Sequence, residues 1–182
     1  MLVLISPLFA MRELSEKDMA TLVAGSTVLK QNPSTPWPTM VVYRKVNASP
    51  HEVLKLFADY ENAPSFAKSL NSAKIIASSP DGLEKTVRYE VKIPLLPSIS
   101  YVVKNKQDPA DLSVSWKKVE SSIFSEIRGE MIVRPHESGS IIRYTSTVQP
   151  SSRLAYPFGG AIPRQAQEIV ENFANEVEKN SR

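Results

Sequence analysis

Four residues that combine an aromatic ring with a polar group stand in separate strand-like runs of the sequence. They are Tyr89, Tyr101, Trp116 and Tyr144. Such a side chain offers a large apolar surface and one hydroxyl or N–H group, which suits the wall of a ligand pocket. Three interpretations stay open: filling of an ordinary core, the wall of a binding cavity, or tyrosines that polarise the carbonyl of a substrate.

The sequence lacks the motifs of the common catalytic and nucleotide-binding sites. It has no nucleophile elbow, no phosphate-binding glycine loop, no H-E-x-x-H and no pair of catalytic carboxylates. Gly159-Gly160 is not flanked by the strand and helix of a nucleotide loop, and Asp59 is placed to cap a short helix. We therefore predict no catalytic residue and no cofactor, which favours a binding protein over an enzyme.

Composition and charge exclude further classes of site. The absence of cysteine excludes disulfides, thiol catalysis and Cys-ligated zinc. The two histidines, His51 and His136, fall at a predicted helix start and a predicted hairpin turn, and no pattern brings them together on a metal. The net charge of +3 and the pI near 9.1 are only mildly basic, and the basic residues are spread along strands. We expect neither a metal site nor a nucleic-acid partner.

Strand patterns dominate the middle of the chain. An alternating run covers residues 40–47, and six more follow between residues 72 and 148. In residues 83–93, for example, Tyr89 shares one face with apolar neighbours while charged side chains occupy the other. Alternation of this kind predicts an antiparallel sheet with one solvated face.

Two helical regions accompany these strands. Residues 48–66, ASPHEVLKLFADYENAPSF, begin with a capping box of Ser49 and Glu52 around Pro50 and predict a compact helical pair. Residues 163–180 carry an apolar stripe at helical spacing. The order is β-α-α-β6-α, an α+β fold with a curved seven-stranded antiparallel sheet around a long C-terminal helix. This arrangement usually encloses a hydrophobic cavity.

The N-terminal part of the chain divides into two segments before the main domain. Residues 1–11 are apolar and resemble the core of a secretion signal, although no positive region precedes them; a local apolar arm is the alternative. Residues 12–38 predict a capped helical extension and a Pro-rich linker. We favour export to the periplasm or the medium over a cytoplasmic location.

The helical pair also resembles a known superfamily. Ser49-Pro50-His51-Glu52-Val53 and the run from Asp59 to Phe66 are similar to the "SP-x-EV" and "D-Y/F-E-x-x-P-x-F" motifs of the START-like (SRPBCC) superfamily, in its polyketide cyclase/dehydrase and lipid-transport branch. Ile127–Met131 and Ile142–Tyr144 are similar to a later region of that branch, with Met131 in place of the commoner tryptophan. The resemblance implies a helix-grip fold and assigns residues 39–182 to a START-like ligand-binding domain. It does not fix the activity, because members include lipid carriers, coenzyme-Q-binding proteins, cyclases and hydroxylase subunits.

We therefore expect a hydrophobic small molecule, lipid or isoprenoid-like, bound between the sheet and the C-terminal helix of a carrier or sensor. A cyclase or aldolase-type enzyme and a filled-core interaction domain are the alternatives. Elements near Pro94–Ser98 and Ser151–Ile162 would gate access of the ligand to the cavity. Transient membrane contact would fit a lipid ligand. The sequence does not fix the oligomeric state. The expected ligand-binding residues are Tyr89, Tyr101, Trp116, Met131, Tyr144, Phe158, Ile169 and Phe173.

Overall fold

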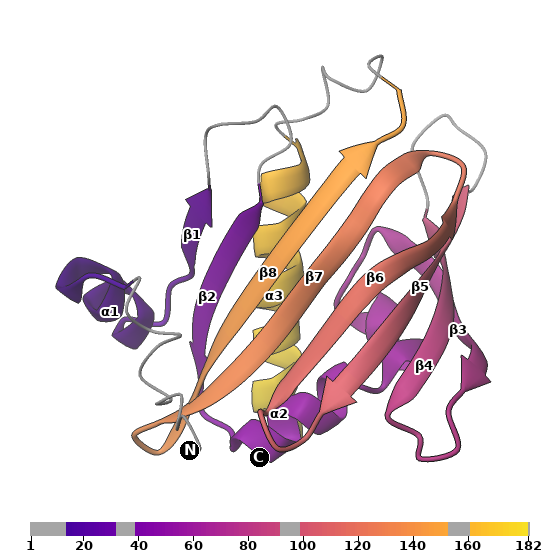
Figure 1. Ribbon diagram of the computed structural model, residues 1–182. Helices are drawn as coiled ribbons and strands as arrows, with labels where there is room; N and C mark the ends of the chain where they lie inside the picture. Colours follow the sequence, from indigo (N-terminus) through magenta and orange to yellow (C-terminus); the bar gives the residue numbers. More distant parts are fainter. Residues whose placement is uncertain (1–13, 32–38, 92–98, 153–160, 182) are drawn as a thin grey trace, which may run out of the picture.

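The computed structural model describes residues 14–31, 39–91, 99–152 and 161–181 (Figure 1). Residues 1–11, the expected site residue Phe158 and most of both expected gating segments lie outside these ranges, so those expectations remain predictions. The elements follow in the order α1 (Glu16–Val23), β1 (Val28–Gln31), β2 (Met40–Val46), α2 (Pro50–Phe57), the 3₁₀ helix η2 (Tyr60–Ser65), β3 (Leu70–Ser78), β4 (Glu84–Val91), β5 (Ile99–Asp108), β6 (Ser113–Ser121), β7 (Phe124–His136), β8 (Gly139–Pro150) and α3 (Ala161–Asn180).

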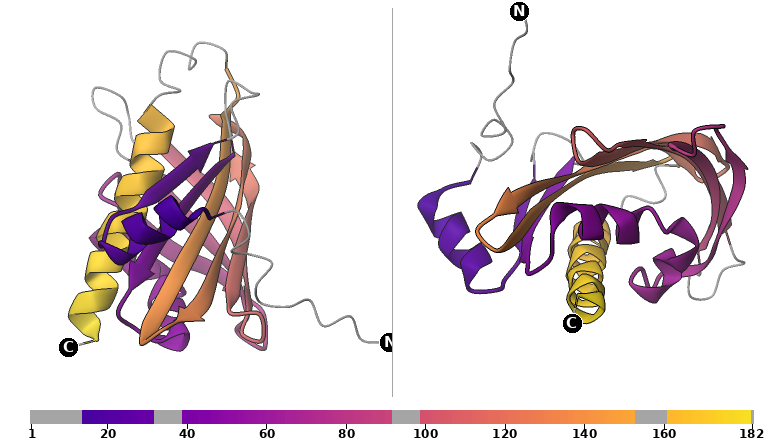
Figure 2. Two further views of the ribbon diagram at one scale, coloured as in Figure 1. Left: turned by 90° about the vertical axis from the view of Figure 1, so that its left-hand side faces the viewer. Right: turned by 90° about the horizontal axis from the view of Figure 1, so that it is seen from below.

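The strands of the described chain form one antiparallel sheet of eight strands, in the order β1-β2-β8-β7-β6-β5-β4-β3. The sheet curves, and α3 runs along its concave side (Figure 2). The expected α+β helix-grip architecture is confirmed, but the expected number of seven strands is wrong. The additional strand is β1, which pairs with the edge of β2 from Val28↔Tyr43 to Gln31↔Met40. Four residues are too few to show a clear period of two, which is why this strand was hidden in the extension.

The helix starts follow the local chemistry of the sequence. The Ser49 hydroxyl accepts a hydrogen bond from the Glu52 amide, and the Glu52 carboxylate accepts one from the Ser49 amide, so the predicted capping box of α2 is present. Ser15 and Asp18 form the same motif at α1. Asp59, in contrast, makes no capping hydrogen bond at η2, contrary to the prediction. Only Ala58 and Asp59 separate the end of α2 from the start of the short 3₁₀ helix.

Neighbouring residues of β2 show how the two faces of the sheet are used. Val42 packs with Ala166 and Val170 of α3. Tyr43 points the other way and packs with Leu22 of α1. The α1 segment thus lies at the β1–β2 edge and covers the face away from α3 (Figure 2).

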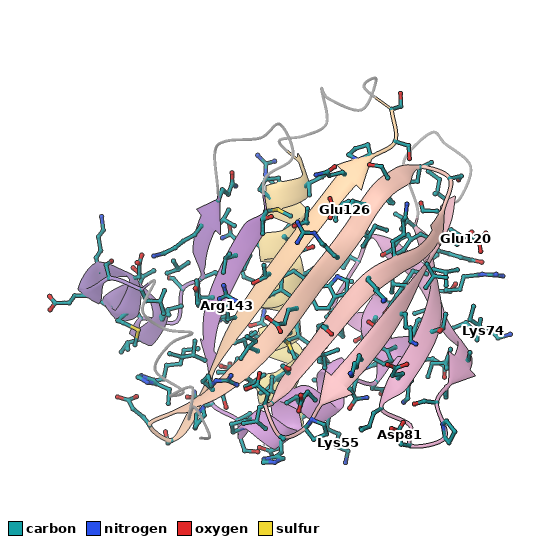
Figure 3. All side chains as sticks on the ribbon, viewed as in Figure 1. Lys55, Lys74, Asp81, Glu120, Glu126 and Arg143 are labelled. Atoms are coloured by element: carbon teal, nitrogen blue, oxygen red, sulfur yellow. The ribbon has the colours of Figure 1, made fainter. Side chains whose placement is uncertain are left out.

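Charged side chains occupy other parts of that outer face. Figure 3 shows Glu126 and Arg143 on the side of the sheet away from α3, and Glu126 forms an ion pair with Arg128. Apolar side chains therefore concentrate on the concave face, between the sheet and the helices α2, η2 and α3. This is where a site for an apolar ligand has to lie.

Candidate functional site: an aromatic cavity beneath the C-terminal helix

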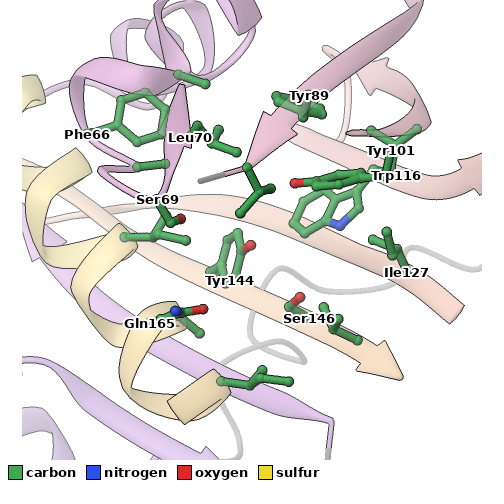
Figure 4. Close-up of a pocket in the computed structure, with 18 of the residues that line it drawn as sticks. Phe66, Ser69, Leu70, Tyr89, Tyr101, Trp116, Ile127, Tyr144, Ser146 and Gln165 are labelled. Atoms are coloured by element: carbon green, nitrogen blue, oxygen red, sulfur yellow. The ribbon is translucent and has the colours of Figure 1, made fainter. Parts of the chain in front are cut away.

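A cavity of about 230 Å³ lies between the concave face of the sheet and the first half of α3 (Figure 4). Strands β4 to β8 supply one wall, and η2 with the residues that follow it supplies another. The first turns of α3 supply the third wall through Ile162, Gln165, Ala166 and Ile169. The curvature of the sheet explains the space, because one straight helix cannot follow the whole concave surface.

Aromatic rings in mutual contact form most of the wall. The rings of Tyr89 and Tyr101 stack with centroids 5.4 Å apart, and Phe124 meets Tyr101 edge-on at 5.9 Å. Trp116 of β6 and Tyr144 of β8 form a second pair, in which the centroids of the indole and the phenol ring are 5.1 Å apart. Phe57 of α2 reaches the same indole at 5.9 Å. Contacting rings hold one another in place, so the wall is preformed.

A glycine makes room for the Trp116 ring. Trp116 pairs with Gly129 across β6 and β7. A Cβ at position 129 would lie 2.3 Å from Cζ2 of Trp116 and 2.4 Å from the carbonyl oxygen of Thr145. Only a residue without a side chain lets the indole lie flat over the strand, and this position of the indole shapes the cavity.

The polar groups of the cavity are neutral. They are the hydroxyls of Tyr60, Tyr89, Tyr101, Tyr144, Ser69 and Ser146, the indole N–H of Trp116 and the side-chain amides of Asn105 and Gln165. No carboxylate, amine, guanidinium or imidazole belongs to the described residues that line the cavity. The interior is therefore suited to an apolar body with a few groups able to form hydrogen bonds.

Burial keeps the cavity tyrosines protonated. It raises the pKa of Tyr60 to about 12, partly offset by the side chain of Gln107. Burial also raises the pKa of Tyr89, Tyr101 and Tyr144 above the usual value for tyrosine. Each phenol is therefore a hydrogen-bond donor at neutral pH and not a base.

The structure brings five of the eight expected site residues to this cavity. These are Tyr89, Tyr101, Trp116, Tyr144 and Ile169. Met131 and Phe173 do not line it: they are 0% and 2% exposed and belong to the packed core beside it. Both lie on the predicted apolar faces, but their side chains are packed into the core, that of Phe173 against the rings of Phe57 and Phe66, so their expected place in the cavity wall is corrected.

Several lining residues were not expected from the sequence. Ile127, Ser146 and Val148 share the alternation of residues already identified and could have been found by extending it. Asn105 follows Tyr101 by four residues on the same face, but its polar side chain suggests an outward position. Phe66 and Leu70 follow η2, where no periodic pattern indicates a face.

The described part of the chain contains no group of three or more His, Asp or Glu side chains placed to hold a metal ion. Among the helices in the described ranges, none is both long and apolar enough to cross a membrane.

Comparison with known protein families identifies the family of this chain. The sequence profile of the family "Polyketide cyclase / dehydrase and lipid transport" matches residues 38–181, and the chain belongs to this family. No curated protein sequence matches.

Solved structures from several bacteria share the fold. An aromatase/cyclase from Streptomyces sp. R1128 has a TM-score of 0.69 at 13% identity, over 86% of this chain and 96% of its own. A STAR-related lipid transfer protein from Xanthomonas axonopodis has a TM-score of 0.69 at 10% identity, over 83% and 92%. A START superfamily protein from Mycobacterium smegmatis has a TM-score of 0.63 at 17% identity, over 78% and 95%. At these identities the likeness establishes the fold alone.

Proposed function

We propose that this protein binds a hydrophobic small molecule, lipid or isoprenoid-like, in the aromatic cavity and acts as its carrier or sensor. The observation that carries the proposal is the cavity of about 230 Å³ with preformed aromatic walls and neutral polar groups. Burial of the ligand against these walls contributes ~25 cal/mol per Å² of apolar surface. Transient contact with a membrane, from which such a ligand would be collected, belongs to the same proposal.

The energetic cost of an empty cavity supports an occupant. If it were closed and dry, a space of about 230 Å³ would cost roughly 5–6 kcal/mol at about 24 cal/mol per Å³. A typical domain has a stability of only about 5–15 kcal/mol. A filled-core interaction domain would avoid this cost by packing the space.

An enzyme of the cyclase or aldolase type is the second candidate, because the protonated phenols of Tyr101 and Tyr144 could donate to a ligand carbonyl. A structural neighbour is itself an aromatase/cyclase. Against this candidate, the described lining offers no acid or base to move a proton to or from carbon. A carrier returns its ligand chemically unchanged after incubation, whereas an enzyme returns a product.

Filling the cavity from α3 tests the binding proposal. Ile169 lines the cavity, and Ile169→Trp places an indole in the space of the ligand. Loss of about 60 Å² of buried ligand surface costs about 1.5 kcal/mol, so the Kd for a fluorescent fatty acid should rise about tenfold.

Glu168→Trp is the matched control, because Glu168 is the exposed neighbour of Ile169 on the same helix. It should leave the Kd unchanged. If the wild type and Ile169→Trp bind the fluorescent fatty acid equally tightly, the fatty acid binds outside this cavity, which would contradict the proposal.

A further inference from the structure

Lys118 lies on the concave face, next to residues that line the cavity. Lys118 follows Trp116 by two residues on β6, so the two side chains share a face. In the β5–β6 register Lys118 lies opposite Val103, which lines the cavity. The side chain of Lys118 is half-buried, unlike that of its exposed neighbour Lys117.

The Lys118 ammonium is held at the point where the pairing of β6 with β7 ends. The β6–β7 pairing ends at Lys117↔Arg128, whereas β7 continues along β8 as far as Phe124↔Pro150. The first carbonyls of β7 therefore lack a partner on β6. The Lys118 ammonium donates to two of them, Phe124 O at 3.1 Å and Ser125 O at 2.6 Å.

These contacts place the positive charge beside the cavity wall. The ring of Phe124, whose carbonyl accepts from Lys118, lines the cavity and contacts Tyr101. Neighbouring hydroxyls fix the hairpin: the Ser121 hydroxyl accepts from the amides of Ile123 and Phe124. The lysine is thus held in a defined position and is not a free surface side chain.

Within the described ranges, Lys118 has no carboxylate partner: no carboxylate there lies within 4.0 Å of its ammonium. An ammonium has three donors, and the two carbonyls use two of them. One donor, and a positive charge without a carboxylate partner among the described residues, therefore remain beside Phe124 and Val103 of the cavity wall.

We infer that Lys118 recognises the anionic head group of an amphipathic ligand whose apolar chain occupies the cavity. This inference rests on the proposed function and names its ligand class: an apolar chain ending in a carboxylate or a phosphate. A half-buried lysine without a carboxylate partner among the described residues gains more from such a head group than an exposed lysine would. The neutral interior of the cavity then binds the apolar chain of the ligand, and Lys118 determines at which side the head group lies.

Three probes with one apolar chain and different heads test this inference: dodecanoate, dodecyl phosphate and dodecanol, each competing with a fluorescent fatty acid at pH 8. The wild type should bind an anion about tenfold or more tightly than the alcohol, since a charged hydrogen bond is involved. Lys118→Gln should remove that preference and leave dodecanol within about twofold. Lys118→Arg, which keeps charge and donors, should retain it.

Lys117→Gln removes a charge from the next residue on the outer face and should change nothing. If only dodecanoate or only dodecyl phosphate binds more tightly than dodecanol, the ligand of the protein carries that head group. The inference fails if the wild type binds dodecanol as tightly as both anions, a comparison that needs no variant. It also fails if Lys118→Gln weakens all three probes equally. Binding of no probe at all would instead overturn the proposed function.

Discussion

Phe173→Ala is expected to lower the free energy of unfolding by about 3–5 kcal/mol, the range for truncation of a fully buried phenylalanine. The Phe173 ring is 2% exposed and lies between two other rings. Its centroid is 5.5 Å from that of Phe57 and 5.0 Å from that of Phe66. Both neighbours line the cavity, so Phe173 supports the wall from behind. Denaturant melts of the ligand-free protein measure the loss.

The enlarging substitution separates this role from a direct contact with ligand. In a packed core Phe173→Trp overpacks the site and destabilises the protein by ~1–3 kcal/mol. A residue lining the cavity would accept the larger ring without loss of stability, and probe binding would weaken because the ring fills the space. Tolerance of Phe173→Trp combined with weakened binding would restore Phe173 to the cavity wall, as the sequence alone indicates.

Gly129→Ala should destabilise the protein by about 1–3 kcal/mol, although it adds only one methyl group. The new Cβ would meet the Trp116 ring and the carbonyl oxygen of Thr145. The ring can turn away, but the carbonyl belongs to the neighbouring strand and can yield only by a shift of the backbone. Displacement of Trp116 should also weaken binding of the fluorescent fatty acid, since the indole is part of the wall.

A double-mutant cycle with Trp116→Ala isolates the contact between the ring and the glycine. With the indole removed, Gly129→Ala should cost less, and the coupling energy should fall in the range of about 0.5–3 kcal/mol. Strict additivity of the two substitutions would show that the ring does not depend on Gly129.

The sequence predicts which face of the sheet a side chain occupies. It does not predict equally well whether that side chain borders the cavity or is packed in the core. Period-two alternation correctly placed Tyr144 and Met131 on the concave side. These two residues pair directly across β7 and β8, yet Tyr144 borders the cavity whereas Met131 is fully buried. The difference depends on where the helices cross the sheet, which is a long-range property that no local pattern encodes.

Capping boxes are local motifs, and the sequence predicts both of them, whereas its prediction of a side-chain cap at Asp59 is wrong. The two capping boxes, at Ser15 and Ser49, are present because each needs only a hydroxyl and a carboxylate three residues apart. Strand β1 was missed because its four residues gain their stability from pairing with the edge of β2 and not from their own pattern. Alternation along β6 puts Lys118, unlike Lys117, on the face of Trp116. The carbonyls that hold its ammonium follow only from the end of the β6–β7 ladder.

Native mass spectrometry of the purified protein, followed by solvent extraction, tests the central claim most directly. The account predicts one hydrophobic small molecule per chain, either retained from the host or taken up from an added fatty acid. The molecule should be recovered chemically unchanged, and Ile169→Trp should reduce its occupancy. Protein that stays ligand-free even with excess fatty acid would contradict the assignment of this cavity as a binding site.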